Sequence, residues 1–265
     1  MTEVLGYIAI IIIGIVLGAV GAGGSMLATP VLVYLFALSM ETASAYSLFL
    51  VGMTSLAGVA IKRKEHFVIG SALTFGIPSL AGAFVARKWI ITCIPHCIAR
   101  MQHFHLTKET LLLLMFSLMM IGSSLLLLRQ VKSNNNRVDA KPYALIPAGL
   151  ITGLLAGLMG AGGGFLILPS LLIFARLHFA PALGTTLLII SCNSLLGFCG
   201  DVLNHDVNWP FLLSITGLAI AGLFIGYWSH ERLPSKRESQ RGLAWCMMAI
   251  GIFVFCKQIA VTCLL

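Results

Sequence analysis

The sequence contains little charge. Only 10% of its 265 residues are Asp, Glu, Lys or Arg, whereas a soluble domain carries about a quarter. Hydrophobic residues make up 58% of the chain, and the mean hydropathy is +0.98. This composition excludes an ordinary soluble globular protein, whose surface would need many more charged side chains. It indicates a protein that lies within a lipid bilayer.

Two features of secreted proteins are also missing. The first apolar run, Val4–Val20, has Glu3 before it where a secretory signal would have a basic segment, and it lacks a convincing A-x-A cleavage site. We therefore do not expect a secretory signal. The seven cysteines are an odd number, and most lie in apolar runs, where a thiol acts as a small hydrophobic group. We predict no disulfide framework.

Motifs for nucleotides, metals and nucleic acids are missing too. The runs GAGGS and GAGGG lack the Lys-Ser/Thr of a P-loop and the strand context of a dinucleotide fingerprint. Cys93 and Cys97, with three nearby histidines, are irregularly spaced in a basic loop, which argues against a metal site. The net charge of +8 comes from short basic clusters at predicted helix ends, where lipid headgroups explain it. We expect no cofactor, no metal and no nucleic-acid partner.

Apolar runs of membrane-spanning length recur along the whole chain. About 20 apolar residues, rising about 1.5 Å each in a helix, cross a hydrocarbon core of about 30 Å. Because open strands would leave backbone groups unpaired in lipid, these runs predict an all-α polytopic membrane protein. The runs include Ala43–Ile61, Phe67–Ala86, Thr110–Leu128, Ala182–Cys199, Trp209–Trp228 and Gly242–Val261.

The two halves of the chain repeat one another. A shift of 139 residues aligns them without a gap for over fifty positions. The polar segment 129–141 is then a linker between a first repeat, 1–128, and a second repeat, 142–265. The shift places glycines on glycines and a proline on a proline: Gly14, Gly18, Gly21, Gly23, Gly24 and Pro30 fall on Gly153, Gly157, Gly160, Gly162, Gly163 and Pro169.

The distribution of charge favours an inverted relation between the repeats. If the Gly-Pro segments Val4–Ala37 and Tyr143–Ala175 each crossed once, Lys and Arg would divide 8 inside to 9 outside. If each segment turns back at its glycines, the division is 12 to 5, which satisfies the positive-inside rule. Each repeat is then a broken, re-entrant Gly-Pro helix hairpin plus three transmembrane helices, and the odd number of crossings inverts the halves around a cytoplasmic linker. The basic loop Arg87–Lys108 fits this arrangement least well.

The glycines have two predicted uses. Gly14-x-x-x-Gly18 and its counterpart in the second repeat are spacings that let helices pack closely. Contiguous glycines instead permit positive φ and break a helix. A new helix is expected to begin at about Ser25 and at about Phe165, and its unpartnered first amides and positive dipole end favour an anion. The residues predicted to face the anion are Gly21, Gly23, Gly24, Ser25, Gly160, Gly162, Gly163 and Gly164.

No charged residue falls in the middle of a predicted span, so an anion would have to be bound by amides, hydroxyls and carboxamides. A single Ser or Thr in a membrane helix more often bonds back to its own turn. Asn193 is the exception, because a buried carboxamide needs partners. The candidates on the helices that follow the hairpins are Tyr46, Ser47, Thr54, Ser55, Thr185, Thr186, Asn193 and Ser194.

Two further pairs of residues occur in both repeats. Pro30 and Pro169 are expected to fix the geometry of the half-helices. His66 and His205, at the predicted membrane edge, could be gates or protonation sites. Histidines at the interface without such a role are an equal alternative.

The combination of motifs resembles the TauE/SafE sulfite exporter family, also called the toluenesulfonate uptake permease family. The resemblance covers nearly the whole chain. It implies a multi-pass carrier of the bacterial inner membrane for sulfite, sulfoacetate or organosulfonates. In the first repeat, Ala45-Tyr46-Ser47-Leu48 departs from the usual A/G-T-S-L run, and a tyrosine there could shape the site for a larger substrate. The matching motifs are the doubled G-x-G-G-[GS]-x-x-x-x-P, Gly184-Thr185-Thr186-Leu187, Asn193-Ser194 with Gly197, and His205-x-Val207-x-Trp209.

The sequence therefore predicts a secondary membrane transporter for small sulfur-containing anions that works by alternating access. One alternative is an anion channel, which would use the same amides in a continuous water path. Another is an intramembrane enzyme, which is disfavoured because Ser25 has no His or Asp predicted at its depth. The direction of transport and the coupling ion stay open, with a proton among the options. The small-residue faces would allow a homodimer.

Overall fold

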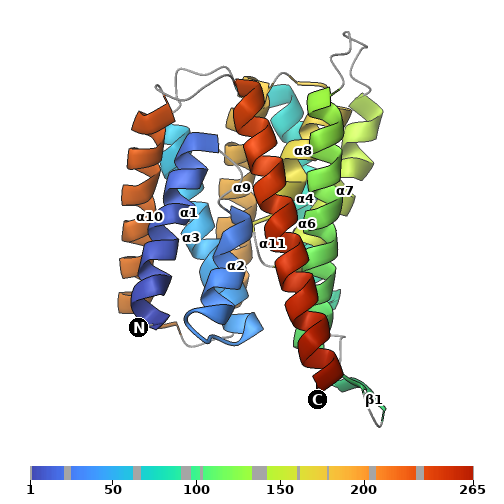
Figure 1. The fold of residues 1–265 in the computed structure, drawn as a ribbon. Coiled ribbons are helices and arrows are strands. Elements are labelled where there is room, and N and C mark those ends of the chain that lie inside the picture. The colour runs from blue at the N-terminus through green and yellow to red at the C-terminus, as the bar shows by residue number, and fades with distance from the viewer. Residues whose placement is uncertain are drawn as a thin grey trace.

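The computed structural model describes residues 2–20, 25–61, 67–90, 97–101, 104–132, 142–159, 162–177, 179–202, 207–230 and 236–264. Almost all of these residues are helical (Figure 1). The elements of the first repeat are α1 (Thr2–Val20), α2 (Ser25–Tyr34), α3 (Met40–Ile61), α4 (Ile69–Val85), the π-helix η1 (Ala86–Ile90), β1 (Cys97–Met101), β2 (Phe104–Thr107) and α6 (Lys108–Lys132). Those of the second are α7 (Pro142–Met159), α8 (Gly164–Phe174), α9 (Phe179–Val202), α10 (Trp209–His230) and α11 (Lys236–Leu264).

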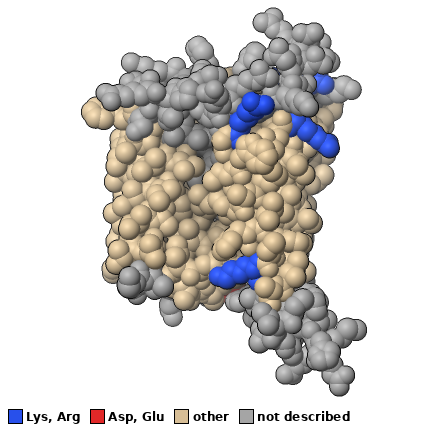
Figure 2. Space-filling view, in the orientation of Figure 1, with Lys and Arg blue, Asp and Glu red and all other residues tan. Residues whose placement is uncertain are grey.

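The predicted membrane architecture is confirmed at the level of its helices. Five helices in the described part are long and apolar enough to span a bilayer. The run predicted at Gly242–Val261 lies in α11, where the apolar stretch Ala244–Ala260 is shorter. Figure 2 shows a broad band without charged side chains between basic groups near the upper and lower ends. The five spans are Met40–Ile61, Ile69–Ile90, Thr110–Arg129, Pro181–Val202 and Trp209–Trp228.

One element was not predicted. The strands β1 and β2 form a small antiparallel hairpin in which Arg100 lies opposite His105 and Met101 lies opposite Phe104. The hairpin lies within the basic loop between the second and third predicted crossings. In Figure 1 it projects from the end of the helical bundle. A hairpin outside the bundle leaves the all-helical membrane part unchanged.

The two repeats contact each other in exchanged pairs. Helix α1 packs against α10, and its counterpart α7 packs against α4, the counterpart of α10. The two equivalent helices α3 and α9 pack against each other, as do α6 and α11. Such an exchange is what a two-fold relation between the halves produces. Moreover, β1, which precedes α6, and the C-terminus, which ends α11, lie at the same lower end in Figure 1, so α6 and α11 run in opposite directions. How the repeats are oriented in the membrane stays a prediction.

The short helices after the glycines fit the predicted break. Helices α2 and α8 have 10 and 11 residues, which at about 1.5 Å per residue is about half the thickness of the hydrocarbon core. Pro30 and Pro169 lie inside these helices, where a proline removes a hydrogen bond and bends the axis. The first α-helix of each repeat contacts the short helix that follows it, as a hairpin requires. That these segments are re-entrant stays a prediction.

Close helix packing explains the spaced glycines. A Cβ on Gly14 would collide with the carbonyl oxygen of Ala219 on α10, and a Cβ on Gly153 with the carbonyl oxygen of Ser79 on α4. A Cβ on Gly157 would lie 2.7 Å from the Cα of Ala83. The predicted packing role of these glycines is therefore confirmed. They set two of the interfaces that join the repeats, α1 with α10 and α7 with α4.

Gly153→Ala is expected to destabilise the protein, because its new Cβ would meet the Ser79 carbonyl oxygen. Overpacking of this kind costs about 1–3 kcal/mol, and the midpoint of thermal unfolding in detergent should fall. Gly217→Ala is the matched control, since a Cβ at this helical position has nothing within 4 Å and alanine favours a helix by about 0.5–1 kcal/mol. An unfolding midpoint for Gly153→Ala at or above that of the wild type would refute the packing role.

Candidate functional site

The chain between α7 and α8 adopts the backbone that the contiguous glycines predicted. Gly162 has a φ of +66° and Gly163 a φ of +69°, in the left-handed region that other residues rarely adopt. The carbonyl oxygen of Gly163 accepts hydrogen bonds from the N–H groups of Leu166 and Ile167, each at 2.9 Å. Helix α8 begins at Gly164, one residue before the predicted start. Its first N–H groups, having no intrahelical partner, mark its positive dipole end.

This break lies where helices of both repeats meet. A Cβ on Gly162 would collide with the Ser194 hydroxyl of α9 and lie 2.9 Å from Cγ1 of Val51 on α3. Ile190, one turn earlier on α9, is also close to that position. Helices α3 and α9 themselves cross closely, since a Cβ on Gly52 would lie 3.3 Å from the backbone nitrogen of Leu195. The start of α8 is therefore enclosed by α3 and α9.

Several predicted site residues carry buried polar atoms without a hydrogen-bond partner. In the described part of the chain, these are the hydroxyls of Ser55, Thr186 and Ser194 and the Oδ1 atom of Asn193. The three hydroxyl residues are 0% exposed and Asn193 is 5% exposed. Since more than about 90% of buried polar groups in proteins are paired, this concentration is unusual. Ser55 and Ser194 are equivalent in the two repeats, so the feature occurs on both sides of the pseudo-symmetry.

Other predicted residues are satisfied within the fold. The hydroxyl of Thr54 donates to the carbonyl oxygen of Leu50 at 2.7 Å, and that of Thr185 donates to Pro181 at 2.7 Å. For these two residues the alternative of bonding back to their own helix is what the structure shows. The remaining two polar candidates, Tyr46 and Ser47, have partners on other segments. Ser47 accepts a bond from Thr29 at 3.1 Å, and the Tyr46 hydroxyl accepts one from the N–H of Asn208 at 2.8 Å.

Asn193 has a partner that the sequence did not reveal. Its Nδ2 donates to the hydroxyl of Ser79 on α4 at 2.8 Å, and Ser79 is 0% exposed. One end of this carboxamide therefore has a partner, whereas Oδ1 has none. The sequence did not indicate Ser79 because the equivalent position in the second repeat is Ala219, so the repeat showed no shared polar residue there.

A partly buried arginine is the second residue that sequence reasoning missed. Arg87 of η1 forms an ion pair with Asp201 at the end of α9, and its Nη2 donates to the Ser44 hydroxyl of α3 at 2.7 Å. The side chains of Arg87 and Asp201 are 12% and 21% exposed. Position alone had placed Arg87 at a helix end, and the expectation was that no arginine could pair directly with a substrate. In the folded chain it is turned toward α9 and α3.

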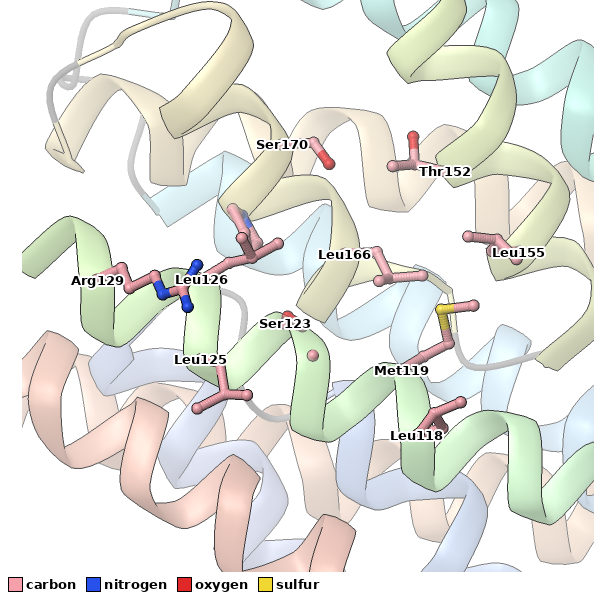
Figure 3. Close-up of a pocket in the computed structure, with 12 residues that line it drawn as sticks. Leu118, Met119, Ser123, Leu125, Leu126, Arg129, Thr152, Leu155, Leu166 and Ser170 are labelled. Atoms are coloured by element: carbon pink, nitrogen blue, oxygen red, sulfur yellow. The ribbon is translucent and has the colours of Figure 1, made fainter.

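Two cavities flank this region. One of about 770 Å³ lies between α4, η1 and α9 and is lined by Arg87, Asp201 and Asn193 among others. The other, of about 470 Å³, lies between α6, α7 and α8. Figure 3 shows Arg129 at one end of the second cavity, with Leu, Met and hydroxyl side chains along it. Apart from Pro169, its lining contains none of the predicted site residues. The predicted site therefore connects to the first cavity through Asn193.

Some predicted positions cannot be placed. Helix α2 begins at Ser25, as predicted. The remaining positions lie outside the described residues: Gly21, Gly23, Gly24, Gly160, His66, His205, Cys93, His96 and His103.

A polytopic helical bundle with a helix broken next to buried polar atoms is typical of a membrane transport protein. Comparison with known proteins specifies the family. The model of the family described as sulfite exporter TauE/SafE matches residues 6–254, and the chain belongs to this family, as its motifs indicated. It is a membrane transporter and not an enzyme.

The chain is similar to several proteins named probable membrane transporter proteins. One from Xylella fastidiosa strain Temecula1 is 28% identical, over 93% of this chain and 92% of the relative. YdhB of Bacillus subtilis is 27% identical, over 81% of this chain and 85% of the relative. A protein of Methanocaldococcus jannaschii is 23% identical, over 80% and 78%. These names support a multi-pass membrane transporter.

The unpaired hydroxyl of Ser194 leads to a prediction about stability. Ser194→Ala should unfold at the wild-type temperature or above it, because it removes a buried hydroxyl that has no partner. Ser124→Ala is the matched comparison, since this serine is also 0% exposed but donates to the carbonyl oxygen of Ala244 at 2.6 Å. Its loss should cost about 1 kcal/mol. Thermal unfolding in detergent measures both. Equal destabilisation by the two substitutions would show that Ser194 serves the fold.

Proposed function

We propose that this transporter is a secondary carrier for small sulfur-containing anions, such as sulfite, sulfoacetate and organosulfonates, in the bacterial inner membrane. The observation that carries the proposal is the unpaired Ser194 hydroxyl beside the left-handed glycines that start α8. The family description, sulfite exporter, supports the substrate class.

The groups at the break have the right chemistry for an oxyanion. The first N–H groups of α8 and the Ser194 hydroxyl are donors, and the helix start adds a partial positive charge of about half a unit. In a buried site of low dielectric such hydrogen bonds are stronger than in water. An anion with several oxygens around one sulfur can accept from several donors at once. Binding would pair groups that the ligand-free fold leaves unpaired.

The carboxamide of Asn193 can contribute a donor as well. Its partner, the Ser79 hydroxyl, can both donate and accept a hydrogen bond. Ser79 can therefore pair with either end of the Asn193 carboxamide, accepting from Nδ2 or donating to Oδ1. When an anion is present, the orientation with Nδ2 toward the anion is favoured, and Oδ1 then accepts from Ser79.

The repeat suggests how the site would be made accessible from each side in turn. Ser55 is the counterpart of Ser194 and is also buried and unpaired, and α2 is the counterpart of α8. The two breaks would face the crossing of α3 and α9 from opposite halves. Rocking of one half against the other around this crossing would expose the anion alternately, as in other transporters with discontinuous helices.

Anion binding by the purified protein tests the proposal. Sulfite, sulfoacetate, taurine and chloride are titrated while thermal unfolding in detergent is followed. At least one sulfur-containing anion should raise the unfolding temperature saturably, and Ser194→Ala should bind it about tenfold more weakly, a loss of about 1.4 kcal/mol. Ser214→Ala is the control, because its hydroxyl is exposed and bonds back to Phe211. The proposal is wrong if none of these anions stabilises the protein. If Ser194→Ala binds the anion as tightly as the wild type and the Ser214→Ala control do, the site is not at this break.

Flux measurements in proteoliposomes distinguish a carrier from a channel. A carrier should take up labelled sulfite with saturation, and unlabelled sulfite inside the vesicles should accelerate this uptake by exchange. These effects arise because the same site must return across the membrane. Uptake that rises linearly with concentration and does not respond to internal sulfite would instead identify an anion channel.

A further inference from the structure

The cavity between α4, η1 and α9 has a charged end and a polar end. Arg87 and Asp201 line it, and so does Asn193 of the proposed anion site. Asn193, Gly197 and Asp201 are spaced four residues apart, so they follow one face of α9. At about 1.5 Å per residue, about 12 Å of helix separate Asn193 from Asp201. One cavity therefore joins the ion pair to the site.

The local structure points the arginine into this cavity. Helix α4 continues into the π-helix η1 at Ala86–Ile90, and a π-turn changes the direction in which the following side chains project. The Arg87 side chain then passes over Gly197, where an added Cβ would lie 3.8 Å from Nε. Gly197 leaves the room that the guanidinium occupies.

The charges around the cavity suit an anion. Lys88 also lines it, with Nζ 5.6 Å from the centre of the Phe84 ring. Among the lining residues that the structure describes, Asp201 is the one acidic side chain, and it is paired with Arg87. A planar guanidinium can bind two oxygens of a carboxylate or of a sulfur oxyanion in the same way. An incoming oxyanion and Asp201 are therefore competitors for one group.

We infer that Arg87 is a second anion-binding station and that Asp201 is its built-in competitor. This inference rests on the proposed function, because the station leads to Asn193. An oxyanion that enters the cavity displaces the Asp201 carboxylate from Arg87, while the bond from Arg87 to the Ser44 hydroxyl holds the guanidinium in place. When no anion is present, Asp201 neutralises the arginine and closes the charged end of the cavity.

Neutralising the competitor provides the test. In calorimetric titrations of sulfite into the full-length protein, Asp201→Asn should bind about tenfold more tightly than the wild type, because the anion no longer has to displace a carboxylate. The double variant Arg87→Gln/Asp201→Asn keeps a neutral, hydrogen-bonding pair and should lose this gain. Glu238→Gln removes one negative charge near the start of α11 and should leave the affinity unchanged.

The outcomes separate this inference from the proposed function. Unchanged or weaker binding by Asp201→Asn, or a gain that persists without Arg87, would overturn the second station. If Ser194→Ala weakens sulfite binding while Asp201→Asn has no effect on it, the result supports the site at the helix break and contradicts the second anion-binding station. If Asp201→Asn tightens sulfite binding while Ser194→Ala has no effect on it, the result supports the second anion-binding station and shows that the helix break is not the site. Failure of the wild type and every variant to bind sulfite would overturn the second station, whereas the proposed function falls only if sulfoacetate and taurine also fail to bind.

Discussion

In hydrocarbon, a polypeptide has to pair its own backbone N–H and C=O groups. The rest of this structure follows from which segments pair these groups within a helix and which segments leave them unpaired. Long helices satisfy them along most of the chain. At Gly162 and Gly163 the backbone turns left-handed, and a helix begins with N–H groups that have no intrahelical partner. Such a break is tolerated in a membrane only when protein encloses it. Here α3 and α9, one from each repeat, provide that enclosure.

The same residues that pack the helices also position the polar site. The backbone of Ser79 receives Gly153 of α7 in close contact, and its side chain accepts a hydrogen bond from Asn193 of α9. A single residue of α4 thus fixes the distance between two helices and anchors the carboxamide nearest to the break. A change in packing at Gly153 would move the groups that surround the proposed anion.

Charge in the membrane part is scarce and is placed where it has partners. Burial of an isolated charge costs several kcal/mol, and Arg87 avoids this by pairing with Asp201 and Ser44 from two other helices. An ion pair of this kind contributes little net stability. It lies at the end of a cavity that reaches Asn193, and this location is the reason for our inference that an anion competes for the arginine.

The sequence by itself determined the class of protein, the family, the repeat and the location of the helix breaks, because hydrophobicity, glycine and proline act locally. It also identified Ser55, Thr186, Asn193 and Ser194 as polar residues of interest, but it could not separate them from Thr54 and Thr185. All six lie on α3 or α9, and only the folded chain shows that Thr54 and Thr185 bond to their own helix while the other four keep an unpaired atom. Ser79, Ser44 and the direction of Arg87 were decided by tertiary structure alone. Their partners lie on other helices, far away in sequence. A repeat alignment cannot reveal a contact that has no counterpart between the symmetry-related helices.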